Sequence, residues 1–346
     1  MPSLVSILIP AYNSQAWIAY TLRSALAQTW AQKEIIVVDD GSQDGTLDVA
    51  RRFESAQVKV VAQPNQGAAA ARNKAYSLAQ GQFIQWLDAD DLLSPDKVAL
   101  QMASAAKTDS RRTLYSAGWA HFMYRPEQAH FAPTGLWEDL APVEWMTRKL
   151  EHNLHMQTAT WLTSRELIEQ AGTWNTTLAT DDDGEYYARI MRHADAVRFV
   201  PGAKVYYRIS PSSRVSYIGR NHRKMEAQLA SMQMHIDYLR AMADTPRVRA
   251  ACVTYLQNWQ LTFYPERPDL VDRARKLAQS LGGELLPPRL SWKYAWIQKT
   301  LGWQAAKLAQ VYYNQSKAVA QRRWDYLMFR LSNSSTAGDS GVVPRS

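Results

Sequence analysis

Three carboxylates lie within four positions at the end of the segment 82–91, QFIQWLDADD. Asp88, Asp90 and Asp91 follow an apolar run at 83–87 that is typical of a buried strand. Open α/β sheets bind ligands at the carboxyl ends of their strands, and hard divalent cations prefer carboxylate oxygens. The segment therefore predicts a site for a divalent cation. The alternative is a solvated turn in which Asp91 caps a helix that begins near 94–95.

Two more acidic groups stand where a side chain can bind or react. Asp39 and Asp40 end an apolar run at 34–38, so they are expected at the same edge of a sheet as the first group. Three consecutive acids at 181–183 precede a segment, 184–191, whose apolar residues have helical spacing. Acids at the start of a helix also act as caps and suit its dipole, which is the structural alternative for this third group.

The elements that must position these acids alternate regularly along the first ninety residues. Apolar runs that predict strands are separated by amphipathic segments that predict helices, and the runs lie at 4–9, 34–38, 58–62 and 83–87. Such alternation favours right-handed crossovers and a parallel sheet. The sequence therefore predicts an α/β fold with a Rossmann-like, mostly parallel sheet and flanking helices. It contains neither a G-x-G-x-x-G dinucleotide motif after a strand nor a G-x-x-x-x-G-K-[ST] phosphate loop.

Four motifs, in order along the chain, resemble the family 2 glycosyltransferases of the GT-A fold. They are SILIPAYN at 6–13, IIVVDDGSQDGT at 35–46, NQGAAAARN at 65–73 and FIQWLDADD at 83–91. A fifth match comprises TWNTTLATDDDGEYYAR at 173–189 and VRFVPGAKVYYRI at 197–209. The resemblance covers about 1–215. It implies a GT-A catalytic domain, for which we take the bounds 1–217.

The resemblance also implies a binding site for a nucleoside-diphosphate sugar, with a UDP-sugar the most favoured donor. In this reading Asp39 binds the base and ribose side of the donor, which suits a carboxylate at a strand end. Capping of the following turn is the alternative for Asp39 and Asp40. The other residues expected beside the nucleotide are Pro10, Tyr12, Asn13, Gly67, Arg72, Asp88 and Ala89. Asp90, together with Asp88, is expected to hold the metal ion, which serves as a Lewis acid for the departing nucleoside diphosphate.

The same resemblance assigns the general base. Counting back from Arg189, the acid pair of the family falls on Asp182 and Asp183, with Asp in place of the usual Glu at 182. The second acid of the pair is the base, which implies Asp183, in an inverting, single-displacement reaction. Many relatives carry a histidine near the metal after the last strand, but this chain has Ser210 there, so no histidine ligand is expected at that position.

The segment between the two acidic motifs contains aromatic residues that can line an acceptor groove, because sugars stack on aromatic faces. Packing in the core is the favoured alternative for each tryptophan, and a structural role is favoured for each histidine. The candidates are Trp137, Trp145, His152, His155 and Trp161.

The chain becomes wholly helical after about 217, which predicts an α-helical C-terminal domain at 218–331. Its segment 289–330 contains eight basic residues, one acid and nine aromatics. Interleaved basic and aromatic residues suit an anionic membrane surface, and a solvated basic face is the alternative. No motif indicates nucleic-acid binding. The tail 332–346 is expected to be disordered.

Composition limits the class of protein. A chain of 346 residues favours two domains. Cys252 is the sole cysteine, so an intramolecular disulfide is excluded and a reducing compartment is expected. The sequence lacks a secretory signal pattern and an apolar run of the ~18 residues that a membrane span needs. These features predict a cytoplasmic protein, either free or attached to the cytoplasmic face of the inner membrane.

The predicted function is metal-dependent, inverting transfer of a sugar to a hydroxyl of a glycan or lipid-linked acceptor, in polysaccharide or glycoconjugate biosynthesis. A nucleotidyltransferase that makes sugar nucleotides is one alternative, but SILIPAYN lacks the glycine-rich, basic loop that such an enzyme needs. A non-catalytic sugar- or membrane-binding module on the same fold is another, although loss of catalysis should have removed some of the acids. The Q-x-x-R-W motif of processive synthases is absent, so a non-processive enzyme is expected. The sequence does not predict an oligomeric state.

Overall fold

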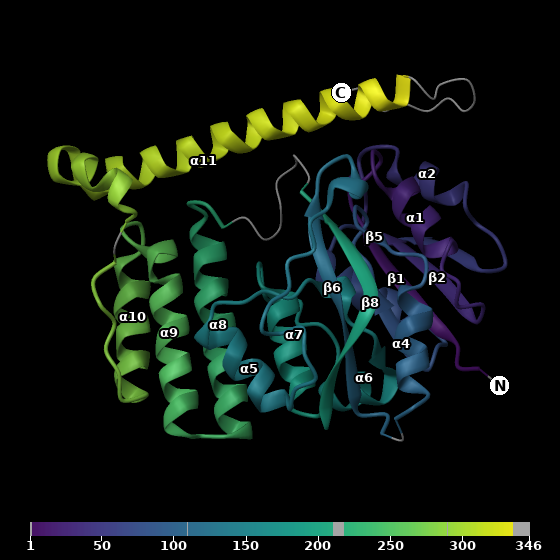
Figure 1. Ribbon diagram of the computed structural model, residues 1–346, viewed down its shortest axis with the longest axis horizontal. Helices are drawn as coiled ribbons and strands as arrows, with labels where there is room; N and C mark the ends of the chain where they lie inside the picture. The colour runs from purple at the N-terminus through teal and green to yellow at the C-terminus, as the bar shows by residue number, and fades with distance from the viewer. Residues whose placement is uncertain (1, 109, 210–217, 289, 335–346) are drawn as a thin grey trace.

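The computed structural model describes residues 2–108, 110–209, 218–288 and 290–334 (Figure 1). Its main sheet has the strand order β3-β2-β1-β4-β7. The strands are β1 (Val5–Ala11), β2 (Lys33–Asp39), β3 (Val58–Ala62), β4 (Phe83–Trp86) and β7 (Thr163–Ser164). The first four are mutually parallel and β7 is antiparallel to β4. The parallel α/β sheet predicted from the alternation of apolar runs is therefore confirmed.

The helices α1 (Ile18–Leu26), α2 (Thr46–Arg51) and α3 (Ala68–Leu78) connect the parallel strands. Because β2 and β4 lie on opposite sides of β1, the chain changes direction across the sheet at the carboxyl ends of β1 and β4. Such a switch point leaves a crevice between the loops, which is where open α/β sheets bind their ligands. The acids that follow β2 and β4 thus lie next to this crevice.

A second sheet, in the order β5-β8-β6, lies beside the first. It contains β5 (Leu92–Leu93), β6 (Thr113–Phe122) and β8 (Ala196–Arg208), with β6 and β8 parallel around a bulge between Ser116 and Gly118. The remaining elements of this half are α4 (Lys97–Ala105), η1 (Pro126–Gln128), α5 (Pro142–Glu151), η2 (Thr158–Thr160), α6 (Arg165–Ala171) and α7 (Asp182–Met191).

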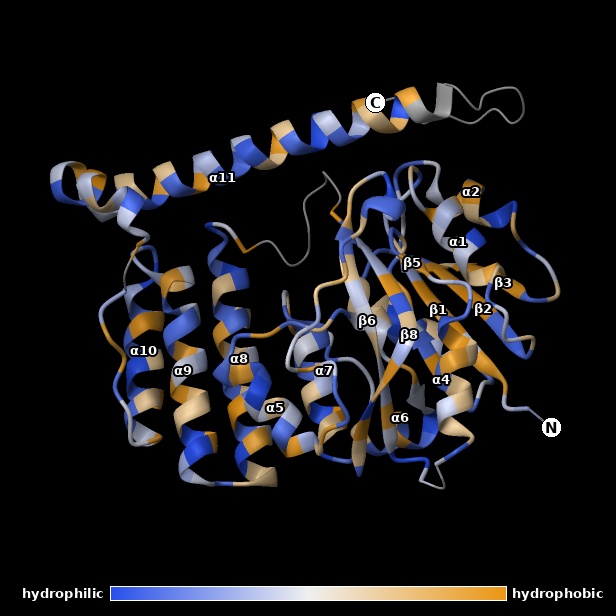
Figure 2. Ribbon diagram, in the orientation of Figure 1, coloured by the Kyte–Doolittle hydropathy of each residue, from blue (hydrophilic) through white to orange (hydrophobic). Residues whose placement is uncertain are grey.

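The helical region packs directly on this α/β half (Figure 1). It comprises α8 (His222–Met242), α9 (Pro246–Phe263) and α10 (Pro268–Ser280). One hydrophobic cluster runs from Leu8 and Trp86, under the sheet, to Met225 and Leu256 on α8 and α9. Figure 2 shows the apolar strands and the apolar sides of these helices that supply this core. The predicted boundary at 217/218 stays a prediction, because 210–217 lies outside the described residues.

A long C-terminal helix, α11 (Ala295–Ser334), follows η3 (Trp292–Tyr294) and runs across the top of the molecule in Figure 1. Its helical geometry is interrupted at Gly302, whose φ of 81° suits glycine. The helix continues through Ser334, and the predicted disorder of 332–346 stays a prediction. The rest of the predicted tail lies outside the described residues. Among those residues, no helix combines the length and the apolar character needed to cross a membrane.

Candidate active site

A cavity of about 440 Å³ lies at the carboxyl edge of the main sheet. It brings together the ends of β1 and β4, the start of α3, the start of α7 and the end of β8. Ten of the eleven residues predicted from the sequence line it: Pro10, Tyr12, Asn13, Gly67, Arg72, Asp88, Ala89, Asp90, Asp182 and Asp183. Asp39 does not line this cavity, although its neighbour Asp40 does.

Asp39 and Asp40 use their carboxylates differently. Asp40 accepts hydrogen bonds from the backbone N–H groups of Gln66 (2.9 Å) and Gly67 (2.8 Å), so it fixes the loop that leads into α3. Asp39 accepts one from Ser42 N–H at 3.1 Å, as the turn-capping alternative requires. However, Oδ1 of Asp39 is buried without a protein partner. Buried polar atoms are normally satisfied, so this oxygen is available to a ligand that reaches it.

Arg72 connects two of the acidic motifs. Its guanidinium forms ion pairs of 2.9 Å with both Asp88 and Asp182, residues that lie at the end of β4 and in the first turn of α7. It also lies 4.3 Å from the ring centroid of Trp174. Burial alone would lower the pKa of Arg72, but Asp182, Asp88 and Asp183 outweigh it and raise the pKa above its usual value. A permanent cation therefore holds the acidic segment 88–91 and the acidic block 181–183 together.

The two candidates for the general base have different environments. Burial raises the pKa of Asp182 to about 6, against the opposing effect of Arg72. Burial would also raise the pKa of Asp183, but His155, Arg72 and hydrogen bonds from Thr158 (3.0 Å) and Gly184 N–H (2.9 Å) outweigh it and lower the pKa. Asp183 is therefore ionised at pH 7, whereas Asp182 is committed to an ion pair.

Helix capping does not explain Asp181, the first acid of the block 181–183. Asp181 occupies the cap position of α7 with a left-handed φ of 56°, but its side chain caps nothing. Its carboxylate instead accepts hydrogen bonds from Ser231 (2.6 Å) and Gln228 (3.1 Å) of α8. The helical region thus fixes the start of the helix that carries Asp182 and Asp183.

Asp91 is not a helix cap, contrary to the alternative weighed for it. It is fully buried and accepts hydrogen bonds from Arg208 N–H (2.8 Å) and the Gln157 side chain (2.6 Å), while α4 begins later and has Asp96 at its cap position. Burial raises the pKa of Asp91, and Asp90 and Asp88 raise it further. The capping alternative fails because two segments distant in sequence bind this carboxylate.

A second cavity, of about 280 Å³, adjoins the first on its helical side. Five residues line both: Asp88, Thr158, Asp181, Asp183 and Tyr207. Asp182 lines the first cavity alone. Of the two candidates for the general base, Asp183 is therefore the one that borders both cavities.

The aromatic residues expected in an acceptor groove mostly lie elsewhere. Trp145 and Trp161 are buried in the core against each other, with ring centroids 5.3 Å apart, as the core alternative predicted. Trp137 stacks on Phe199, and His152 is an exposed neighbour of Glu151. His155 does line the second cavity. None of the other four lines either cavity, and the core packing favoured for the tryptophans is found for Trp145 and Trp161.

Comparison with known proteins supports the resemblance. Residues 6–170 match the model of glycosyl transferase family 2. The chain is therefore similar to this family over just under half of its length. It is 33% identical over 189 residues to the chondroitin synthase of Pasteurella multocida, which is 53% of this chain and 19% of that protein. It is 37% identical over 107 residues to the Escherichia coli UDP-Glc:alpha-D-GlcNAc-diphosphoundecaprenol beta-1,3-glucosyltransferase WfgD, 31% of this chain and 42% of that one.

The chain thus spans less than half the length of these curated relatives. Its fold resembles the crystal structure of Staphylococcus aureus TarS 1–349 in complex with UDP, with a TM-score of 0.61, 17% identity and 80% of each chain covered. A further TarS structure, in complex with UDP-GlcNAc, has a TM-score of 0.56 at 16% identity and covers 80% of this chain and 91% of that one. The predicted GT-A fold class, with its helical C-terminal region, is confirmed.

The metal ligands expected in this domain are two carboxylates. Asp88 and Asp90 line the cavity together, but one oxygen of Asp88 is bound to Arg72. The described residues contain no group of three or more His, Cys, Asp or Glu side chains arranged to hold a metal ion. The donor set fits a hard cation that takes its other ligands from phosphate oxygens and water, as Mg²⁺ commonly does. Position 210, where no histidine ligand was expected, lies outside the described residues.

Several residues of the site were not singled out from the sequence. Arg208, in the matched motif at 197–209, donates to the backbone oxygen of Asp90 at 2.8 Å and lies 4.1 Å from the ring centroid of Trp17. Burial lowers the pKa of Arg208 to about 10, so it remains a cation at neutral pH. The position of Arg208 in the motif could have predicted that it reaches the cavity. Nothing in the local sequence of Trp17 or Thr158 indicates that they do.

Proposed function

We propose that this protein is a non-processive, inverting glycosyltransferase that uses a nucleoside-diphosphate sugar, most favourably a UDP-sugar. The acceptor is a hydroxyl of a glycan or of a lipid-linked saccharide. The observation that carries the proposal is the position of Asp183, which is ionised and borders both cavities. A carboxylate between a donor site and an acceptor site has the geometry that general-base catalysis requires.

Donor binding would use the first cavity. Tyr12, which is 46% exposed, presents its ring to the base, and Oδ1 of Asp39 supplies a buried acceptor for a base or ribose donor group. Arg72 and Arg208 provide two cations on the side where the diphosphate would lie. Asp90, with Asp88 beside it, would hold the Mn²⁺ or Mg²⁺ ion, which when bound supplies Lewis-acid stabilisation of the leaving group.

The chemical step would be a single in-line displacement. Asp183 takes the proton of the acceptor hydroxyl, while the acceptor oxygen forms a bond to the anomeric carbon. The bond from that carbon to the diphosphate oxygen breaks, and the nucleoside diphosphate leaves with the electron pair. The Thr158 hydroxyl, 3.0 Å from Asp183, keeps one carboxylate oxygen in place. Because bond formation and bond breaking lie on opposite faces of the sugar, the anomeric configuration inverts.

One experiment separates this proposal from its alternatives. The purified protein is heated with UDP and other nucleoside diphosphates, with and without Mn²⁺, and is then assayed for nucleoside-diphosphate release from a panel of sugar nucleotides. We expect one diphosphate to raise the melting temperature in a Mn²⁺-dependent manner and its sugar derivative to be hydrolysed slowly. Binding without any turnover would favour a non-catalytic module, and pyrophosphate release from UTP and a sugar 1-phosphate would favour a nucleotidyltransferase.

The proposal includes attachment of the segment 289–330 to an anionic membrane on the cytoplasmic face. Arg289 lies outside the described residues. The described part has five exposed basic residues: Lys293, Lys299, Lys317, Arg323 and Arg330. Exposed Trp292, Trp296 and Trp324 accompany them. Such a combination suits lipid headgroups.

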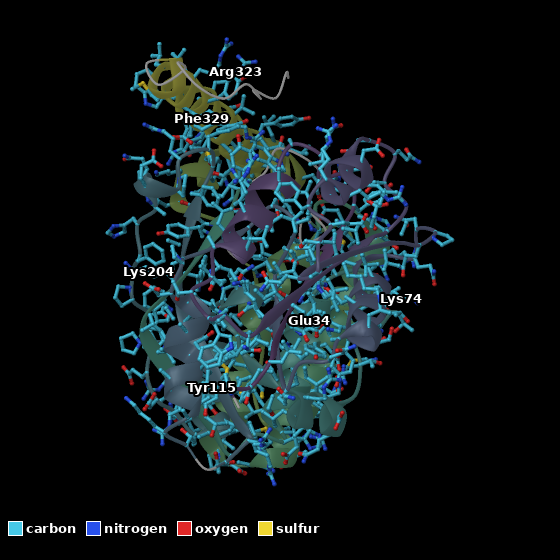
Figure 3. The ribbon with its side chains drawn as sticks, turned by 90° about the vertical axis from the view of Figure 1, so that its right-hand side faces the viewer. Glu34, Lys74, Tyr115, Lys204, Arg323 and Phe329 are labelled. Carbon is cyan, nitrogen blue, oxygen red and sulfur yellow. The ribbon has the colours of Figure 1, made fainter. Side chains whose placement is uncertain are left out.

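The single acid of this segment is turned away from solvent. Asp325 pairs with Arg125 at 2.7 Å and accepts from Tyr124 N–H at 2.9 Å, while Phe329 packs on Tyr124. Figure 3 shows Arg323 on the far side of α11 and Phe329 nearer to the body of the protein. The outer side of α11 is therefore positively charged, which would repel a second copy of the same helix and attract an anionic surface.

Vesicle co-sedimentation tests this attachment. Each basic residue near an anionic bilayer contributes about 1 kcal/mol, so reversing Lys317, Arg323 and Arg330 to Glu should weaken binding at least about a hundredfold. The matched control reverses three exposed residues elsewhere, Arg52, Lys74 and Lys276. Equal binding to neutral and anionic vesicles, or an equal loss in the control, would exclude an electrostatic membrane surface on α11.

A further inference from the structure

The second cavity is lined by charged groups of both signs. Nine residues line it without lining the first cavity, among them Lys149, Asn153, His155, Gln228, Tyr255 and Trp259. Lys149 carries the only full charge of these nine at pH 7. An ordinary histidine has a pKa near 6.5, and desolvation lowers the pKa of His155 further although its ring opens onto the cavity.

The acids of the cavity, Asp88, Asp181 and Asp183, line the wall that it shares with the first cavity. All three have partners within the protein. Asp88 pairs with Arg72 at 2.9 Å, and Asp181 accepts hydrogen bonds from Ser231 and Gln228. Asp183 accepts from Thr158 and from Gly184 N–H, and it is the carboxylate proposed to take a proton from the acceptor. The cavity thus contains both a carboxylate that can take a proton and a cation.

The ammonium of Lys149 lacks the partners that its neighbour has. Arg148, one position earlier on α5, binds Glu144 at 2.7 Å and Glu138 at 2.9 Å. Lys149 forms no hydrogen bond or ion pair with any residue in the described ranges. Its ammonium lies 5.9 Å from the ring centroid of Tyr255 and interacts with Asp181 only through its longer-range charge. A half-buried ammonium with three N–H donors is expected to bind a hydrogen-bond acceptor. Because Lys149 lines the second cavity, a ligand in that cavity can supply the acceptor.

We propose that the second cavity binds an anionic sugar acceptor, with its carboxylate or phosphate beside Lys149 and its reacting hydroxyl beside Asp183. Trp259 offers a ring face to the sugar, and the amides of Asn153 and Gln228 offer hydrogen bonds to its other hydroxyls. The inference rests on the proposed function, because it assigns the substrate class of the same site. The helical region is then part of the acceptor site through Gln228, Tyr255 and Trp259, and Lys149 of α5 selects the acceptor by charge.

A competing role for Lys149 is purely electrostatic within the protein. Desolvation raises the pKa of Asp181 and Lys149 opposes that effect, so the lysine stabilises the ionised form of Asp181. That role predicts a change in stability when Lys149 is removed. It predicts no preference among acceptors, which makes the two roles separable.

The test measures binding of three small probes by ligand-detected NMR to the full chain with UDP and Mn²⁺ present. The probes are methyl β-glucoside, its 6-phosphate and methyl β-glucuronide, which share a ring and differ in charge. We expect one or both anionic probes to bind about tenfold more tightly than the neutral one, the ratio typical of a hydrogen bond to a charged group. The stronger anion identifies phosphate or carboxylate as the recognised group.

Lys149→Met should abolish this preference, Lys149→Arg should retain part of it, and Arg148→Met, the neighbouring control, should leave it unchanged. Equal binding of all three probes, absence of binding by either anion, or a preference that survives Lys149→Met would overturn the inference. Donor hydrolysis without acceptor is measured in parallel. A protein that hydrolyses its donor but shows no anion preference keeps the proposed function and loses this inference.

Discussion

The two cavities share one wall, but their charges are neutralised in different ways. In the first, Arg72 binds Asp88 and Asp182, and Arg208 binds the backbone of Asp90, so the cations are held by protein groups. In the second, Lys149 has no such partner within the described residues. A site whose charges are already paired is preorganised for one ligand. In a site with an unpaired ammonium, the bound ligand has to supply the negative charge that neutralises it.

The two cavities are also built from different elements. Residues from strand ends and motif loops form the first cavity, whereas α5, α8 and α9 supply much of the second. The proposed donor site is thus combined with a wall to which α5 and two helices of the helical region contribute. Substitutions that damage one cavity and spare the other are the direct way to examine the difference.

The largest effect is expected at Asp90, on the donor side of the shared wall. Loss of a Lewis acid removes several kcal/mol of transition-state stabilisation, so Asp90→Asn should reduce transfer by about a thousandfold or more. The melting temperature without ligand should stay near that of the wild type, because Asp90 is partly exposed. Binding of acceptor probes to the second cavity should also be retained. Full activity of this variant, or of the wild type in EDTA, would exclude the metal-dependent mechanism.

Asp183 lies on the shared wall and its loss should affect turnover without affecting donor binding. General-base catalysis contributes about 10²–10⁴-fold, so Asp183→Asn should lower kcat by that factor while the UDP-induced rise in melting temperature persists. Asp182→Asn should be milder, acting through its ion pair with Arg72. If Asp182→Asn is inactive while Asp183→Asn is active, the base is Asp182. Retention of the donor's anomeric configuration in the product would exclude the single displacement altogether.

The smallest effect concerns the stability of the wall behind the second cavity. His235 is fully buried beside Tyr255 Oη at 3.1 Å, and burial lowers its pKa to about 3. Between about pH 6.5 and that value the unfolded chain binds a proton that the native protein does not. The free energy of unfolding should therefore fall with decreasing pH, by up to about 1.4 kcal/mol per unit from this group.

His235→Gln should remove that contribution, so the stability advantage of the wild type should shrink from pH 7 to pH 4.5 in urea titrations. The exposed His130, replaced in the same way, provides the control. A difference between wild type and His235→Gln that stays constant with pH would show that the buried imidazole does not titrate on unfolding in this range.

Much of the lining of the first cavity was predictable because its residues lie at ends of regular elements. Apolar runs mark β1, β2 and β4, and parallel strands bring their carboxyl ends to one edge. Motifs at those ends must therefore converge, which is why residues as distant as Tyr12 and Asp90 line one cavity. Asp183 was found through its motif, although its general-base role remains a prediction.

The tertiary structure alone decided the pairing of charges and the nature of the second cavity. Arg72 and Asp182 are 110 positions apart, and local spacing holds no information about such a contact. The same limit explains why Asp91 binds Arg208 and Gln157 instead of capping a helix, and why Trp145 and Trp161 pack in the core. Lys149 and Arg148 are adjacent basic residues that the sequence cannot rank. Packing of α5 against α9 leaves one of them bound to acids and the other facing a cavity.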